Sequence, residues 1–429
     1  MPKTGGQETR NRILHRVMRL FRERGYNSLG IDEIIEKCAV SKGAFYYHFP
    51  SKQALAEAVI DLHIALAPQM VHVPFEGRSW AEGTEAFVES LLGPKGKPHI
   101  IGAPMANLGL QFAHSRPRLL RKVAVALKAV EDALAVDIAK HGLAPAVASR
   151  RAGTFIALFE GHVLRMLFTR DPAVMPKLIS DLTSLVPEGQ RVPPPLPAWG
   201  GPSSAFSEQA RKKNPEYFLD FVDKPSIMQH RDFVRSKAAG TTEKRAEIVC
   251  KAASLFWRGG YYSTSVNHLA AAACVPKGSF QLYFRTKRDV ALEVLREYGR
   301  REEALFDRAF AEGGWHKAAA VLCAALDRYG FGRYVFGCPL GNMGFEFASA
   351  DRVLSRRVAG LLQTTERRLA EGLARAFGAA IDASGGAATA VALCEGHLTR
   401  MAIYRDRGIV AQLREDLCTM VGENREAGG

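Results

Sequence analysis

The 429-residue chain repeats itself at a constant separation, and this repeat limits the possible folds more than any other feature. Gly25-Tyr26 recurs as Gly260-Tyr261, a separation of 260 − 25 = 235 residues. A repeat this long indicates a duplicated domain, because solenoid repeats are roughly 20–50 residues long. The same separation aligns further pairs without a net insertion: Trp80 with Trp315, Gly102–Asn107 with Gly337–Asn342, Phe112-Ala113 with Phe347-Ala348, and Glu160–Met166 with Glu395–Met401.

Apolar residues follow helical spacing through each unit, and strand-like alternation is scarce. Residues 10–24 carry such a stripe, and Gly25 is suited to the C-cap that ends a helix. The class predicted is therefore all-α. In the first unit we expect helices over residues 32–38, within 40–52, over 52–66 as the start of a longer helix, and over 80–92, 117–141 and 146–170, with a shorter one after Pro172. Pro68, Pro74 and Gly77 are expected to interrupt the chain before residue 80.

Composition divides the chain into five segments. A proline-rich stretch begins at Pro187, and runs of this kind favour extended, semi-rigid chain. We predict a first small helical domain, called the first head, over 1–60, a first helical body over 61–188, a linker over 189–240, a second head over 241–295 and a second body over 296–429.

Charge and cysteine usage narrow the function classes. A net charge of +14 and a pI near 9.5 favour a polyanionic partner such as nucleic acid, although a generally basic soluble protein has the same composition. Seven scattered cysteines without a CxxC pair indicate a reducing cytoplasm and predict no disulfide framework or structural zinc. No apolar signal region and no run of about 18 apolar residues is present, so no membrane span is expected.

Residues 40–52 and their repeat, residues 275–287, have the chemistry of a helix that enters a DNA groove. Such a helix needs little bulk near the phosphates and donors for base edges. Lys42, Gly43 and Ala44 give a slim, basic start, and Tyr46, Tyr47 and His48 give donors and apolar faces. Phe45 and Phe49, four residues apart, are expected to face inward. In the competing interpretation the aromatics are ordinary core and the lysines a solvated face.

Gly-Tyr, a short helix and then Val-Ser-Lys-Gly-Ala-Phe-Tyr-Tyr-His-Phe-Pro-Ser-Lys resemble the N-terminal DNA-binding domain of the TetR family of transcriptional regulators. The resemblance covers residues 9–59 and, less closely, 244–294. It implies a three-helix head on a helical ligand-binding and dimerisation body. The DNA contacts that it implies are Lys42, Gly43, Ala44, Tyr46, Tyr47, His48 and the phosphate-contacting Lys52, and in the second copy Lys277, Gly278, Ser279, Gln281, Leu282, Tyr283 and Lys287.

Members of this family usually dimerise on a palindromic DNA site, and this chain already holds two heads and two bodies. We therefore predict a monomeric, intramolecular pseudo-dimer in which the last two long helices of each unit form a four-helix interface. Tyr46, Tyr47 and His48 are replaced by Gln281, Leu282 and Tyr283 in the second copy. Different donors and acceptors predict an imperfectly palindromic double-stranded operator.

The resemblance also implies a small-molecule effector that releases a repressor from DNA. Candidate pocket residues are Trp80, Phe87, Met105, Asn107 and Phe112, with Trp315, Leu340, Asn342 and Phe347 in the second unit; the alternative is that they are ordinary core. Glu160, His162 and Arg165, repeated as Glu395, His397 and Arg400, suit either a polar pocket rim or salt bridges between the units. Cys338 suits either a redox sensor or a buried inert thiol.

Two other function classes remain. A sequence-independent architectural DNA-binding protein needs only the positive charge. An enzyme with a nucleic-acid-binding head is less favoured, because the sequence has no P-loop, GxSxG, HExxH or metal-ligand spacing. We predict no catalytic residue, metal or cofactor.

Overall fold

The computed structural model describes residues 4–94, 103–113, 116–186, 239–311, 314–327, 337–348 and 350–422. Within these ranges every regular element is a helix, as the sequence predicts. Nearly all of the predicted 189–240 linker lies outside the described residues. The first unit contains α1 (Thr4–Arg24), α2 (Ile31–Cys38), α3 (Lys42–His48), α4 (Lys52–Phe75), α5 (Trp80–Leu92), α6 (Pro104–Phe112), α7 (Pro117–Ala139), α8 (Pro145–Thr169) and α9 (Val174–Thr183).

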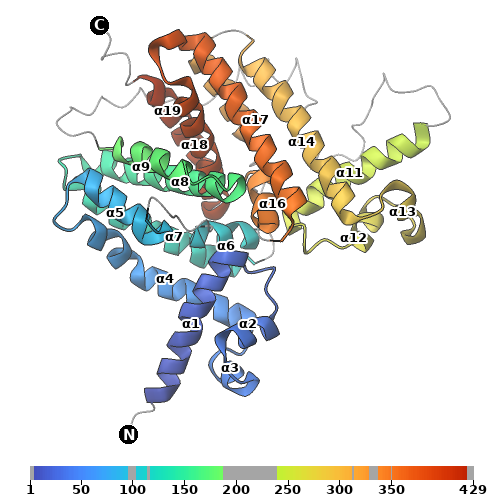
Figure 1. The fold of residues 1–429 in the computed structure, drawn as a ribbon, viewed down its shortest axis with the longest axis horizontal. Coiled ribbons are helices and arrows are strands. Elements are labelled where there is room, and N and C mark those ends of the chain that lie inside the picture. Colours follow the sequence, from blue (N-terminus) through green and yellow to red (C-terminus); the bar gives the residue numbers. More distant parts are fainter. Residues whose placement is uncertain are drawn as a thin grey trace.

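The second unit repeats this order with one change in its head. Its elements are α11 (Ala239–Gly259), α12 (Val266–Ala272), the 3₁₀ turn η2 (Lys277–Ser279), α13 (Phe280–Tyr283), α14 (Lys287–Ala309), α15 (Trp315–Asp327), α16 (Pro339–Ala348), α17 (Arg352–Phe377), the 3₁₀ turn η4 (Gly378–Ala380), α18 (Ala383–Tyr404) and α19 (Ile409–Gly422). Figure 1 shows the two heads, α1–α3 and α11–α13, projecting as separate lobes from the packed bodies.

The expected interruption of α4 is wrong. The helix continues to Phe75 with Pro68 and Pro74 inside it. Pro68 lies on the exposed side of the helix, so water can solvate the carbonyl that a proline leaves without its helical partner. The opposite face of α4 is buried against α5 and α7, and this packing holds the helix together. Of the described helices, α4 is also the one long and apolar enough to cross a membrane, and here it is a core helix of the first body.

The bodies meet where α8 crosses α18 with the two backbones in direct contact. A Cβ atom on Gly161 would lie 1.9 Å from the Ala392 carbonyl oxygen, and one on Gly396 would lie 1.8 Å from that of Ala157. Only glycine fits at these two positions. Helix α17 also contacts α8, and α7 contacts α18, so the four long helices predicted to form the interface do meet.

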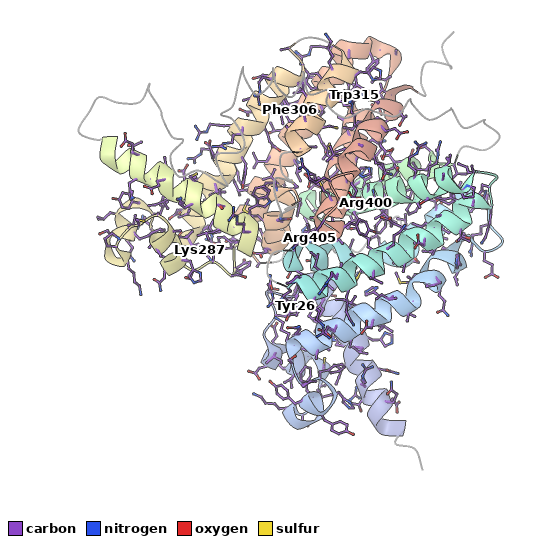
Figure 2. The ribbon with its side chains drawn as sticks, turned by 180° about the vertical axis from the view of Figure 1, so that it is seen from behind. Tyr26, Lys287, Phe306, Trp315, Arg400 and Arg405 are labelled. Atoms are coloured by element: carbon purple, nitrogen blue, oxygen red, sulfur yellow. The ribbon has the colours of Figure 1, made fainter. Side chains whose placement is uncertain are left out.

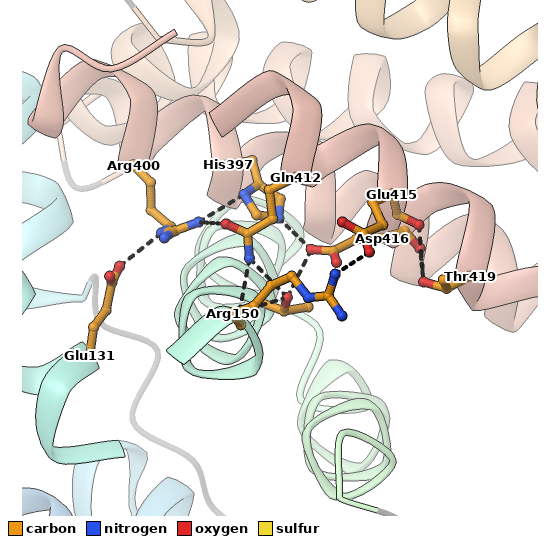
Figure 3. A network of polar contacts seen from close by, with 9 residues as sticks. Glu131, Arg150, His397, Arg400, Gln412, Glu415, Asp416 and Thr419 are labelled. Atoms are coloured by element: carbon orange, nitrogen blue, oxygen red, sulfur yellow. Dashed lines mark hydrogen bonds and ion pairs between the residues drawn. The ribbon is translucent and has the colours of Figure 1, made fainter. Parts of the chain in front are cut away.

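A hydrogen-bonded chain crosses this interface twice. In the copy drawn in Figure 3, Arg400 Nε donates to Glu131 of the first unit at 2.9 Å, and Arg400 Nη1 donates to His397 Nδ1 at 3.0 Å. His397 Nε2 then donates to Asp416 at 2.8 Å, and Thr154 of the first unit donates to the same carboxylate at 2.9 Å. Because Nδ1 accepts and Nε2 donates, the imidazole is neutral. Burial accordingly lowers the pKa of His397.

The other copy uses the equivalent groups of the opposite units. Arg165 Nε donates to Glu366 at 2.5 Å and Arg165 Nη1 to His162 Nδ1 at 2.8 Å. His162 Nε2 lies 2.7 Å from Asp181, which also accepts from Thr389 at 2.9 Å. The inter-unit salt-bridge prediction is thus right for the two arginines. It is wrong for the histidines, which pair within their own unit, and for Glu160 and Glu395, which face the body interiors.

Candidate nucleic-acid interface

The first head is a helix, turn and helix whose second helix is capped and anchored. The Ser41 hydroxyl accepts a hydrogen bond from the Ala44 amide at 3.1 Å, which starts α3 at Lys42. Phe45 and Phe49 are fully buried with ring centroids 6.0 Å apart, so the inward orientation predicted for them is confirmed. These contacts fix α3 on α1 and α2 and leave its other face outward.

The outward face of α3 carries four of the predicted DNA-contacting residues, Lys42, Gly43, Tyr46 and Tyr47, whereas Ala44 and His48 are half-buried. Tyr46 is 39% and Tyr47 74% exposed, which is unusual for large aromatic side chains. Lys42 is exposed, and its Nζ donates to Asp32 on α2 at 3.0 Å. Asp32 raises the pKa of Lys42, so the ammonium is held charged at the edge of this face. The structure brings these groups onto one surface together with Gly43.

Gly43 has no internal reason to be glycine. Its φ angle is not in the left-handed region, and a Cβ atom there would meet nothing within 4 Å. Gly278 in the second head has the same open surroundings. A position that tolerates bulk within the fold suits a site where an outside molecule approaches the backbone.

The second recognition element is shorter than its repeat partner. Pro276 stands where the first head has Ser41 and offers no side-chain cap. Residues 277–279 therefore form a 3₁₀ turn, and the α-helix covers only Phe280–Tyr283. Gln281 and Leu282 still point outward, with Leu282 77% exposed, while Phe280 is buried. The two heads differ in backbone as well as in side chains.

Lys52 and Lys287, for which the resemblance implies phosphate contacts, are engaged inside their heads. Lys52 Nζ donates to the Leu29 carbonyl at 2.5 Å and lies 4.2 Å from the centre of the Tyr26 ring. Burial lowers its pKa to about 8. Lys287, which Figure 2 labels in the second head, donates through Nζ to the carbonyls of Tyr261 and Thr264, each at 2.9 Å. Both ammonium groups therefore hold the Gly-Tyr turn against the start of α4 or α14.

The same turn joins each head to its body. Gly25 and Gly260 have φ angles of +78° and +85°, which confirms them as helix-ending glycines. In the first joint the Asn27 amide donates to Gln111 at 2.7 Å. In the second the Tyr262 amide donates to Glu346 at 2.9 Å. Burial raises the pKa of Glu346 to about 7, so only the second joint contains an acid that titrates near neutrality.

The predicted pocket residues lie in the packed interior. Trp80 Nε1 donates to the carbonyls of Leu182 and Thr183 at 3.3 and 3.1 Å, and Trp315 Nε1 donates to Leu417 at 2.6 Å, so each tryptophan ties α5 or α15 to the last helix of its unit. The remaining candidates are also buried except Asn342, which is half-buried; they are Phe87, Met105, Asn107, Phe112, Leu340 and Phe347. Burial also raises the pKa of Cys338 well above its ordinary value, which disfavours a reactive thiolate.

Sequence reasoning missed a polar cluster in the first body. Arg22 Nε, His63 Nε2 and Glu160 Oε2 are buried without a hydrogen-bond partner, and the charge of Arg22 acts on both His63 and Glu160. Unsatisfied buried polar atoms are rare in native proteins and need an explanation. A comparison of the two repeats could have drawn attention to this cluster, because the second unit has Trp257 at the position of Arg22 and Tyr298 at that of His63.

Each head has a helix-turn-helix with an exposed second helix, and each is fixed to a helical body. This architecture is that of the helix-turn-helix class of DNA-binding proteins. The family model for bacterial regulatory proteins of the tetR family matches residues 13–59 and 248–294, one match in each head. Both heads are therefore TetR-family DNA-binding domains, one in each of the two tandem units.

Relatives match over part of their length. The transcriptional regulator AcuR of Cereibacter sphaeroides is 31% identical over 147 residues, 34% of this chain and 60% of AcuR. The regulator UidR of Escherichia coli is 42% identical over 77 residues, 18% of this chain and 38% of UidR. This chain thus spans less than two thirds of either relative. A solved TetR regulator from Legionella pneumophila aligns with 44% of this chain and 99% of its own, at 18% identity and a TM-score of 0.38.

Proposed function

We propose that the protein is a cytoplasmic, sequence-specific transcriptional regulator and not an enzyme. In this proposal it is a repressor that binds an imperfectly palindromic operator as a single chain and leaves it when a small effector binds. The observation that carries the proposal is the pair of outward faces, Tyr46-Tyr47 and Gln281-Leu282, each presented by buried phenylalanines and each followed by a half-buried residue, His48 or Tyr283. Different side chains at equivalent places read different base edges.

The matched variants Lys42→Ala and Lys277→Ala test this division of labour. Footprinting on the operator should show Lys42→Ala weakening protection of one half-site by about tenfold and Lys277→Ala weakening the other. Equal losses on both halves would contradict two independent readers. Sedimentation of the DNA complex should give one chain per operator.

The competing function is sequence-independent DNA packaging. Affinity for operator and scrambled duplexes, measured over a range of salt concentrations, separates the two. A regulator should retain a preference of about a thousandfold or more, whereas an architectural binder shows similar affinities with the same salt slope.

The effector site that we propose is the polar cluster of the first body. Burial raises the pKa of Glu160 to about 8 and lowers that of His63 to about 4, so near neutral pH both groups are largely uncharged. Arg22 belongs to α1 of the head, and its Nη2 donates to the Leu91 carbonyl of α5 at 2.8 Å. A ligand that bonds to Arg22 would therefore act on the link between head and body.

The second unit supplies the control for this site. Trp257 fills the position of Arg22 and donates to the Gly337 carbonyl at 3.2 Å. The double variant Arg22→Trp, His63→Tyr places in the first unit the two residues that the second unit has at the equivalent positions. In a panel of small uncharged and amphipathic compounds, any compound that releases wild-type protein from the operator should fail on this variant. Equal release from both proteins would place the effector elsewhere.

A further inference from the structure

A cavity of about 940 Å³ lies where the two units meet, between the end of α8 and the start of α17. Phe168 and Arg170 of the first unit face Arg352, Arg356 and Gly360 of the second across it. The volume is within the range of sites that hold small organic ligands. None of the polar cluster of the first body borders this cavity, so the two sites are separate.

The charged side chains that border the cavity are three arginines and one aspartate. Asp351 is the one acid that borders the cavity, and it is buried and already committed, because it pairs with Arg288 Nε at 2.6 Å and caps α17. Within the part of the chain that the structure describes, Arg170, Arg352 and Arg356 form no ion pair, and the hydrogen bond of Arg170 is to the Ala348 carbonyl. Three guanidinium groups therefore border one cavity without a counter-ion.

The rest of the lining combines the polar Thr169, Ser355 and Gln363 with apolar residues and leaves room. The Phe168 ring packs on Phe345 at 6.1 Å between centroids and forms one wall. On α17, a Cβ atom at Gly360 would meet nothing within 4 Å. The first unit has Pro117 at the position of Arg352, and Val125 at that of Gly360. The second unit therefore combines the charge of Arg352 with the open space at Gly360, and the first unit has neither at the equivalent positions.

We propose that this cavity binds an organic anion with an apolar portion, of the carboxylate or sulfonate type. The acid group would be held by Arg352 and Arg356, which suit bidentate recognition of such groups. The apolar portion would lie along Phe168 and the open surface at Gly360. The site adds a second ligand to the function proposed above and does not depend on DNA binding.

The site is joined to the second head through one ion pair. Asp351 holds Arg288, which follows Lys287 at the start of α14. Arg288 does not border the cavity, so a bound anion would act on this ion pair through the negative charge that it places beside Asp351.

Fluorescence titration of the full chain with 8-anilinonaphthalene-1-sulfonate tests the proposal. Saturable binding is expected, with an affinity at least about tenfold lower for Gly360→Val, which places a branched side chain in the cavity, and for Arg356→Ala. Arg121→Ala changes the equivalent residue of the first unit and should leave binding unaltered. Absence of saturable binding to the wild-type chain, or equal binding to all four proteins, would overturn the proposal.

Two further measurements sharpen the result. The neutral analogue N-phenyl-1-naphthylamine should bind at least about tenfold more weakly than the sulfonate, and equal binding would refute the anion requirement. Melting curves should show that Gly360→Val folds, since its side chain enters open space. The assays contain no DNA, so their failure leaves the regulator proposal standing, and failure of operator binding leaves this site standing.

Discussion

Gly43 in α3 and Gly360 in α17 both lie in helices at positions where a Cβ atom would meet open space. Alanine at either position should stabilise the fold by up to about 1 kcal/mol, because glycine weakens helices. Gly43→Ala should nevertheless weaken operator binding by about tenfold if DNA approaches the backbone there, whereas Gly360→Ala should not. Thermal unfolding and mobility-shift titrations of the two variants check this, and unchanged DNA affinity in Gly43→Ala would show that the position is simply permissive.

Glu346 makes the second head–body joint sensitive to pH. Its pKa in the folded protein is about 7, above the ordinary value of 4.5, so the folded state binds more protons between these values. The contribution of this group to stability is therefore fully present below about pH 4.5 and is lost as the pH rises through 7. Glu346→Gln copies Gln111 of the first joint and should flatten this part of the profile.

Melting temperatures of the wild type and Glu346→Gln between pH 4.5 and 8 measure the difference. Gln111→Glu is the reciprocal variant, and it should introduce the same decline in the first joint. Parallel curves for wild type and Glu346→Gln would mean that the carboxyl group titrates normally.

At the scale of single elements, the second recognition helix is limited by its missing cap. Pro276→Ser supplies a hydroxyl at the position of Ser41 and should allow the α-helix to start at Lys277, with a gain of about 1 kcal/mol in local stability. Hydrogen exchange of residues 277–283 should slow, and affinity for the second half-site should rise. Unchanged exchange would mean that the 3₁₀ turn is set by more than the cap.

Sequence patterns predicted those elements whose causes are local. The helix Trp80–Leu92 and the helix-ending Gly25 follow from apolar spacing and from glycine conformation, and both are found. The shortened α13 was not predicted, because the repeat suggested two helices of equal length. The loss of the N-cap side chain at Pro276 was not taken into account. The course of α4 through Pro68 depends on packing against α5 and α7, which lie far away in the sequence.

The candidate site also contains some features that local sequence predicts and others that depend on distant segments. The inward Phe45 follows from helical spacing and is confirmed. The partners of Lys52 and His162 depend on where distant segments return, so spacing could not identify Leu29 or Asp181.

At the scale of the whole molecule, one glycine pair sets how closely the units approach. Gly161→Val would drive its side chain into the Ala392 carbonyl and should destabilise the protein by about 3 kcal/mol or more. Gly360→Val is the matched control, because its side chain meets no neighbour. Urea unfolding of both variants gives the comparison, and similar midpoints would contradict the close α8–α18 crossing.

The α8–α18 contact joins two parts of one polypeptide, so dilution cannot separate its partners. In a dimer of separate chains, the folded fraction and the melting temperature decrease when the protein is diluted. Here the second unit is always present at the effective concentration set by its tether. A single molecule of this chain therefore carries both heads already paired, without an association step that would depend on protein concentration.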